Sequence, residues 1–158
     1  MDVSKQKKEI NIQSEHQSDN FCNFKGNHLL LEVYGCNKEK LNDELYLRCQ
    51  LNSAAKLAKA SVLNIVSNKF EPFGVTAIAL LAESHLSIHT WPESYYSAID
   101  IFTCGRNMKP KLASQFLIES LEASNHLLKT IARDYPSHIK EQIREHTKIF
   151  LSIKLATD

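Results

Sequence analysis

The chain has 158 residues, of which 43% are hydrophobic, and this is enough for the core of one domain. Its 19 basic and 18 acidic residues give a formal net charge of +1, which provides no electrostatic field for nonspecific binding of nucleic acid or anionic lipid. The N-terminal residues lack the apolar core of a signal peptide, and no run reaches the roughly 18 apolar residues that span a bilayer. We therefore expect a cytoplasmic protein with neither nucleic acid nor membrane as a partner.

The chain opens with a polar, aperiodic stretch, so residues 1–24 are expected to be a mobile N-terminal tail. The short apolar run 28–35 predicts a strand, because it is closed by glycine. Leucine and alanine then recur at helical spacing over 37–60, with Asn42 and Asp43 as possible N-caps, which predicts a helix.

Strand patterns dominate the middle of the chain. Apolar runs predict strands over residues 61–70, 75–82, 85–90 and 95–105, and a last strand over 126–136. The sequence Glu-Pro-Phe-Gly at 71–74 predicts a hairpin turn, and an apolar face over 109–124 predicts a second helix with Pro110 in its first turn. Because strands outnumber helices and one pairing is antiparallel, the order predicts an α+β fold rather than a doubly wound parallel sheet.

Residues 136–158 carry an apolar stripe with a seven-residue repeat. Its members are Ile139, Ile143, His146, Phe150 and Ile153. The stripe predicts a C-terminal helical extension that packs on the sheet or on a partner chain.

The four cysteines, Cys22, Cys36, Cys49 and Cys104, show no Cys-x-x-Cys spacing. In a reducing compartment such residues are thiols. We therefore expect neither a structural disulfide nor a metal site.

The apolar run that ends at Ala82 leads directly into reactive groups. A serine hydroxyl such as that of Ser84 is a weak nucleophile unless a base takes its proton, and a histidine such as His89 can act as that base. The Gly-x-Ser-x-Gly elbow of many serine hydrolases is absent, so a serine at a strand end beside a half-buried histidine remains an alternative. In a straight strand the two residues lie roughly 16 Å apart on opposite faces. If they cooperate, the chain has to bend between Ala82 and His85.

The sequence GVTAIALLAESHLSIHTWPE (Gly74 to Glu93), followed by DIFTCG (Asp100 to Gly105), closely resembles the short prokaryotic S-adenosylmethionine decarboxylase proenzymes. The likeness begins at Asn27. It implies an α+β sandwich in which an antiparallel sheet carries two helices packed on one face. It also implies a homodimer of αβ protomers with active sites near their interface.

The resemblance implies a chain that cuts itself and makes its own pyruvoyl cofactor. Ser84 would attack the carbonyl of Glu83, and elimination from the resulting ester would leave a pyruvoyl group in place of Ser84. Residues 25–135 would then be a self-processing domain cleaved between 83 and 84. His89 takes the position of the processing base, and Thr76 takes that of a hydroxyl residue implicated in processing.

The resemblance also assigns catalytic and binding roles. The substrate amine would form a Schiff base with the pyruvoyl group of residue 84, and Cys104 would protonate the carbanion left after carbon dioxide departs. Phe70 and Trp91 match aromatic positions between which adenine stacks, and Glu93 matches an acidic residue that binds the ribose hydroxyls.

The expected function is therefore decarboxylation of S-adenosylmethionine, which yields the aminopropyl donor for spermidine biosynthesis. Two alternatives stay open at this point. One is a pyruvoyl-dependent arginine or ornithine decarboxylase on the same fold, and the other is an unprocessed, non-catalytic regulatory homologue.

Overall fold

The computed structural model describes residues 25–105 and 107–134, so the tail at 1–24 and the extension at 136–158 lie outside the described residues. In chain order the elements are β1 (Lys25–Tyr34), α1 (Lys38–Leu41), α2 (Glu44–Leu57), β2 (Val62–Lys69), β3 (Val75–Leu81), β4 (Ser84–Trp91), the 3-10 turn η1 (Pro92–Ser94), β5 (Tyr96–Cys104), α3 (Pro110–Ser120) and β6 (Asn125–Asp134). Among these described helices, none is long and apolar enough to cross a membrane.

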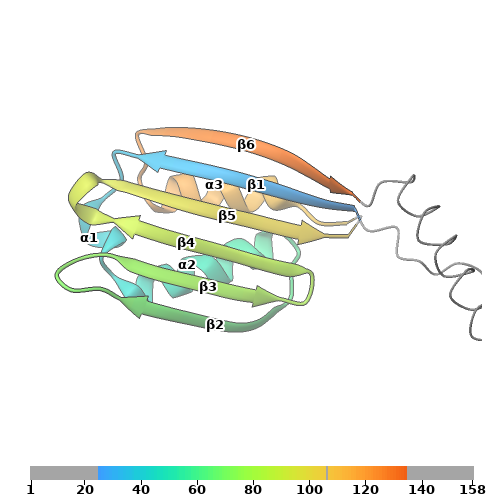
Figure 1. Ribbon diagram of the computed structural model, residues 1–158, viewed down its shortest axis with the longest axis horizontal. Helices are drawn as coiled ribbons and strands as arrows, with labels where there is room; N and C mark the ends of the chain where they lie inside the picture. The colour runs from blue at the N-terminus through green and yellow to red at the C-terminus, as the bar shows by residue number, and fades with distance from the viewer. Residues whose placement is uncertain (1–24, 106, 135–158) are drawn as a thin grey trace, which may run out of the picture.

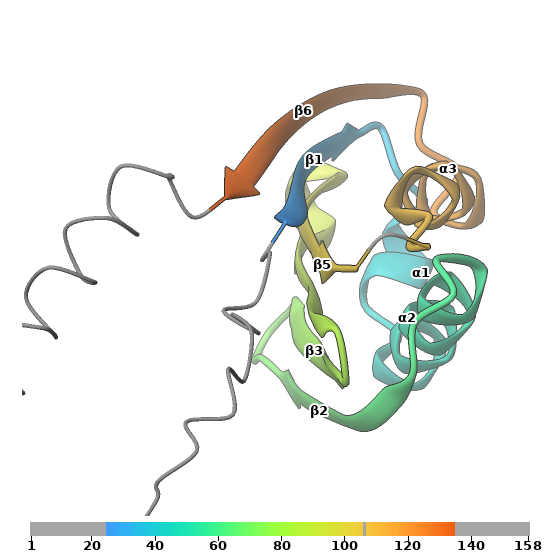
Figure 2. The ribbon, with the colours of Figure 1, turned by 90° about the vertical axis from the view of Figure 1, so that its right-hand side faces the viewer.

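The strands form one six-stranded sheet in the order β2-β3-β4-β5-β1-β6. Every neighbouring pair is antiparallel. Figure 1 looks onto the sheet, and Figure 2, turned by 90°, shows the helices gathered on one side of it. The α+β fold with an antiparallel sheet and two helices on one face is therefore confirmed, and so is the last strand, β6.

Period-two alternation explains which face of the sheet is buried. Along β5, the side chains of Ser97, Ile99, Ile101 and Thr103 are buried and those between them are half-buried. The buried set packs against α2 and α3, whose Leu47, Leu51 and Leu117 are fully buried. Burial of each such leucine contributes about 1.5–3 kcal/mol, so this layer stabilises the fold.

The opposite face of the sheet is covered by no described helix, and we call it the open face. Its large, partly exposed apolar side chains come from five of the six strands: Tyr34, Val66, Ile78, Leu80, Trp91, Leu127 and Ile131. A sheet face this apolar is unusual for a surface that meets only water. The open face is therefore a candidate contact surface.

The predicted helix over 37–60 consists of two helices. The side chain of Asn37 accepts hydrogen bonds from the N–H groups of Glu39 and Lys40, which caps the four-residue α1. The Asp43 side chain accepts from the Tyr46 N–H at 2.9 Å, which confirms this residue as the N-cap of α2. Two side-chain caps six residues apart separate the segment into a short helix and a long one.

Candidate active site

The apolar run of β3 turns back on itself at Ala82 and Glu83, so β3 and β4 form a tight hairpin. The first residue after the turn, Ser84, has a φ of +152°, a region that side chains other than glycine rarely occupy. Such a conformation stores strain of about 1–3 kcal/mol. The predicted bend between Ala82 and His85 is therefore confirmed, and the strain lies at the predicted scissile serine.

The peptide between Glu83 and Ser84 is held at two points. The carbonyl oxygen of Glu83 accepts a hydrogen bond from the Cys104 N–H at 3.0 Å. The Glu83 carboxylate accepts another from the Ser61 N–H at 2.9 Å. The N–H of Cys104 is therefore aimed at the atom that would become negatively charged if a nucleophile attacked this carbonyl.

Cys104 ends β5 with its side chain on the open face, and its thiol is free. A Cβ placed on Gly26 would lie 2.7 Å from the Phe102 ring and 3.4 Å from the Cys104 sulfur, so the glycine provides the space that these two side chains occupy. Burial raises the pKa of the Cys104 thiol, and the nearby Arg133 lowers it in part. The thiol is therefore protonated near neutral pH and able to donate a proton.

His89 lies further along β4 and is joined to β3. Its Nδ1 is 2.8 Å from the hydroxyl oxygen of Thr76, the residue opposite it in the β3–β4 ladder. The structure thus brings together the two residues predicted to assist processing.

The structure does not place His89 near Ser84 within one chain. β4 keeps a regular register with β3 and β5 from Ser84 to Trp91, so five residue steps leave the two side chains roughly 16 Å apart on opposite faces. The bend lies before Ser84 and therefore cannot close this distance. The hypothesis that a bend lets these two residues cooperate in one chain is wrong for this reason.

The predicted substrate-binding residues lie at the other end of the sheet. Phe70 and Trp91 are 49% and 42% exposed, and Glu93 lies in η1 directly after Trp91. The Phe70 N–H donates to the Gly74 carbonyl at 2.8 Å, and a Cβ on Gly74 would lie 2.9 Å from the carbonyl oxygen of Thr90, the residue before Trp91. A residue without a side chain therefore separates the two aromatic positions. Gly74 also has a φ of +103°, a value that favours glycine.

The site residues thus fall into two groups. The scissile group is Glu83, Ser84 and Cys104, and the binding group is Phe70, Thr76, His89, Trp91 and Glu93. In Figure 1 the start of β4 and the end of β5 lie together at one end of the sheet, and the end of β4 lies at the other. Seven residue steps along β4 correspond to roughly 23 Å between Ser84 and Trp91.

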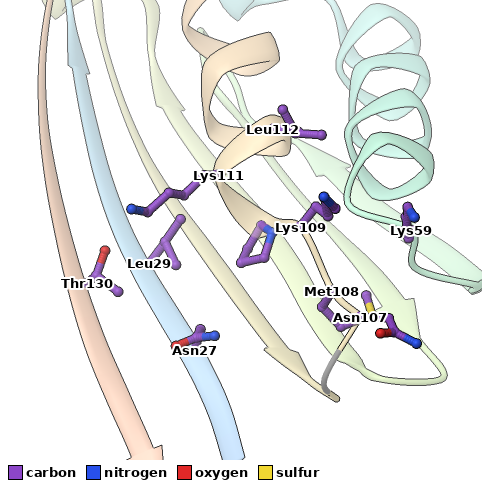
Figure 3. Close-up of a pocket in the computed structure, with 10 residues that line it drawn as sticks. Asn27, Leu29, Lys59, Asn107, Met108, Lys109, Lys111, Leu112 and Thr130 are labelled. Carbon is purple, nitrogen blue, oxygen red and sulfur yellow. The ribbon is translucent and has the colours of Figure 1, made fainter.

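A hollow of about 880 Å³ lies on the helix side of the sheet, between α3 and strands β1 and β6 (Figure 3). Lys109, Lys111, Asn27 and Thr130 are among the residues that line it. None of the predicted site residues does, so this hollow is not the site. Within residues 25–105 and 107–134, no three His, Cys, Asp or Glu side chains gather as metal ligands would.

Sequence reasoning missed several residues around the site. Gly26 and Arg133 flank Cys104 but come from β1 and β6, so only the strand register reveals them. At the centre of the open face, Asp100 lies 3.3 Å from the His28 ring and accepts a hydrogen bond from Ser87. The period-two alternation of β4 and β5 is the sequence signal that could have placed Ser87 and Asp100 on one face.

The ring of Trp91 belongs to a stack of aromatic rings that the sequence analysis did not predict. Its ring stacks on that of Tyr96 with centroids 5.2 Å apart, and Tyr96 stacks on Tyr34 at 5.4 Å. One face of the indole is therefore covered by the protein, which fixes its orientation.

Together these features define a class of protein: a two-layer α+β sandwich with a strained serine directly after the glutamate of a hairpin turn and a thiol beside it. The chain is similar to a solved structure of this fold, the adenosylmethionine decarboxylase from Aquifex aeolicus VF5. The TM-score is 0.67 and the sequences are 32% identical, over 72% of this chain and 94% of that one.

A family model described as S-adenosylmethionine decarboxylase matches residues 27–134. The S-adenosylmethionine decarboxylase proenzyme of Synechococcus sp. (strain WH7803) is 51% identical over 116 residues, which is 73% of this chain and 91% of that protein. The proenzyme of the same name from Thermodesulfovibrio yellowstonii is 41% identical, over 75% of this chain and 87% of its own length. The chain belongs to the S-adenosylmethionine decarboxylase family.

Proposed function

We propose that the chain is a self-cleaving S-adenosylmethionine decarboxylase proenzyme. Its product would be decarboxylated S-adenosylmethionine, the aminopropyl donor for spermidine. The observation that carries the proposal is the strained backbone conformation of Ser84, directly after a Glu83 carbonyl that already accepts a hydrogen bond from the Cys104 N–H. The names of the relatives support the reaction, and the local geometry supports the place of cleavage.

Cleavage follows from the chemistry of these residues. The Ser84 Oγ attacks the Glu83 carbonyl carbon, the C–N bond breaks, and the Oγ proton moves to the Ser84 nitrogen. The Cys104 N–H stabilises the oxyanion that forms on the way. Elimination then removes the Cα proton of residue 84, breaks the Cβ–Oγ bond and releases the Glu83 carboxylate. Water hydrolyses the resulting dehydroalanine to a pyruvoyl group and ammonia.

A pyruvoyl group would then stand at position 84, at the start of a strand and one backbone hydrogen bond from Cys104. It would supply the electrophilic carbonyl that draws electrons from the substrate, which no ordinary side chain offers. The residues at this position fit such a group, because the hairpin presents residue 84 at the sheet end rather than inside the core.

Proton delivery and substrate binding fall to other residues of the chain. The raised pKa of Cys104 keeps its thiol protonated, as a proton donor to a carbanion requires. Gly74 is hydrogen-bonded to Phe70 and lies beside the backbone that leads into Trp91, so a flat ring can enter between the two aromatic side chains. Glu93 would accept hydrogen bonds from the ribose hydroxyls.

A complete site requires two copies of the chain. Within one chain, His89 and Trp91 of the binding group lie roughly 16 Å and 23 Å along β4 from Ser84. The side chain of His89 also faces away from that of Ser84. If two open faces pack together in opposite orientation, the binding group of each protomer meets the strand end that carries the partner's Cys104, whose side chain lies on this face, and Ser84, whose side chain has to turn from the helix side to reach it. The apolar side chains of the open face suit such a homodimer.

The first test is the intact mass of the purified protein. We expect two fragments, residues 1–83 and a second fragment that begins with a pyruvoyl group, and carbon dioxide release from S-adenosylmethionine but not from arginine or ornithine. Ser84→Ala should remain one chain. A wild-type chain that stays whole at about 18.0 kDa would refute cleavage and favour the non-catalytic alternative.

The second test is complementation between two inactive variants. Cys104→Ala removes the proton donor and Trp91→Ala removes a binding ring, so each homodimer should turn over slowly. Unfolding and refolding a mixture of the two should restore part of the activity, because one of the two sites in a mixed dimer is intact. No gain over the separate variants would contradict a site shared between protomers.

A further inference from the structure

One buried hydroxyl in the described part of the chain has no hydrogen-bond partner, and it belongs to Thr103. This residue is 1% exposed, and its Oγ1 is the buried side-chain polar atom left unpaired among residues 25–105 and 107–134. Buried polar atoms are almost always paired, because an unpaired one loses its hydration without compensation. The hydroxyl of Thr103 therefore destabilises the resting fold.

The other buried hydroxyls show the usual arrangement. Thr90 accepts a hydrogen bond from the Val75 N–H at 2.8 Å and donates one to the Leu41 carbonyl at 2.8 Å. Ser97 donates to the His89 carbonyl at 2.8 Å. Thr103 is thus an exception, and the fold gives no reason for a hydroxyl rather than a methyl group at this position.

Thr103 lies directly opposite Ser84 in the β4–β5 ladder. The Cys104 N–H donates to the Glu83 carbonyl, which makes residues 83 and 104 the hydrogen-bonded pair. Ser84 and Thr103 are then the non-hydrogen-bonded pair, in which side chains approach most closely. Their Cβ atoms are expected about 4.5–5.5 Å apart, so two hydroxyls can meet.

The hydroxyl of Ser84 is held only weakly at present. Its Oγ lies 3.4 Å from Nδ1 of His85, which is long for such a hydrogen bond. Rotation about the Cα–Cβ bond of Ser84 is therefore inexpensive, and it can bring the Oγ toward Thr103. The same strand end supplies both the Cys104 N–H for the scissile carbonyl and a free hydroxyl for the nucleophile.

We propose that Thr103 is a positioning residue for self-cleavage, whose hydroxyl hydrogen-bonds to Ser84 Oγ and holds it against the Glu83 carbonyl carbon. The proposal rests on the proposed function. In the step it assists, the Oγ–C bond forms, the C–N bond breaks, and the proton passes from Oγ to the Ser84 nitrogen. Thr103 orients the attacking oxygen and is unchanged at the end.

Two substitutions separate positioning from packing. Thr103→Val keeps the shape and removes the hydroxyl, and Thr103→Ser keeps the hydroxyl and removes a methyl group. We expect Thr103→Val to slow the appearance of the two fragments roughly 100-fold, because a misplaced nucleophile loses its attack geometry. Thr103→Ser should cleave within about ten-fold of the wild type.

Stability is measured in the uncleavable Ser84→Ala background, so that every chain stays intact. There Thr103→Val should unfold at the same or a higher urea concentration than its parent, since it removes an unpaired buried polar atom. A large fall in its midpoint, with equally slow cleavage of Thr103→Ser, would show that the residue acts through packing and would overturn the proposal.

Hydroxylamine identifies the step affected, because it cuts the ester intermediate and leaves a hydroxamate on Glu83. With Thr103→Val we expect no rapid cleavage on its addition, since the ester does not accumulate. Rapid cleavage would place the defect after the acyl shift and overturn the proposal, as would wild-type rates in Thr103→Val. If the wild type itself did not cleave, the proposed function would be refuted. That result differs from one in which the wild type cleaves and the role of Thr103 is refuted.

Discussion

At the scale of single residues, the space around Cys104 depends on a missing side chain. A Cβ on Gly26 would lie 2.7 Å from the Phe102 ring and 3.4 Å from the Cys104 sulfur. Gly26→Ala should therefore displace the thiol and slow carbon dioxide release about ten-fold, while cleavage continues because the Cys104 N–H is untouched. Fragment analysis and turnover of the same sample test this. Equal turnover by variant and wild type would contradict the crowding argument.

Arg133 should set the acidity of the same thiol. Its guanidinium lies over the Phe102 ring and favours the thiolate of Cys104, which opposes the effect of burial. Arg133→Met keeps much of the side-chain length and removes the charge. The pKa of Cys104 should then rise further, because the thiolate loses its nearby cation while the desolvation remains. The pH dependence of thiol alkylation should shift to higher pH.

The measurement uses iodoacetamide and a chain in which Ser84 is Ala and Cys22 and Cys49 are Ser. The buried Cys36 is 2% exposed and reacts slowly. Lys129→Met is the matched control, since Lys129 lies on the same face of β6 but four residues, or roughly 13 Å, further from the thiol. An equal shift in both variants would mean that overall charge, not Arg133, controls the thiol.

At the scale of elements, Thr90 connects three parts of the fold. Its hydroxyl joins the end of α1, through the Leu41 carbonyl, to Val75 at the start of β3. Thr90→Val leaves the Val75 N–H and the Leu41 carbonyl without this partner, which should cost about 1–3 kcal/mol of unfolding free energy. Urea denaturation in the Ser84→Ala background measures the loss. Thr90→Ser, which keeps the hydroxyl, should lose much less.

The two buried threonines show what sequence alone can and cannot give. Both are β-branched residues in strand patterns, and only the register shows that one is fully paired and the other not. Apolar patterns and turn residues predicted each strand of the described residues, because alternation in β5 and continuous apolar sequence in β3 are strong signals. It missed α1, because four residues are too few to show a helical repeat.

At the scale of the whole molecule, the residue types of the candidate site were readable in the sequence and their separation along the sheet was not. The strand spacing did predict that Ser84 and His89 lie on opposite faces of β4, and the register confirms it. The sequence gives no sign that the bend would precede Ser84 and leave the two groups far apart. That separation depends on the ladder that β4 forms with both neighbours, which is a tertiary property.

If the open face is the dimer interface, a new charge among its apolar side chains should separate the protomers. Ile78 is 39% exposed on this face, between β2 and β4. Ile78→Asp would bury a carboxylate without a partner, so sedimentation should find monomers. Cleavage and turnover should both fall, because Thr76 and His89 would no longer reach the partner's scissile group.

The matched control is Leu45→Asp on α2, where the side chain is 75% exposed on the helix side. An aspartate in the first turn of a helix is well tolerated, so this variant should stay dimeric and active. A folded, monomeric Ile78→Asp that cleaves and turns over at wild-type rates would contradict the shared site. In that case the substrate would have to be bound entirely by residues near Ser84, at the Cys104 end of one protomer.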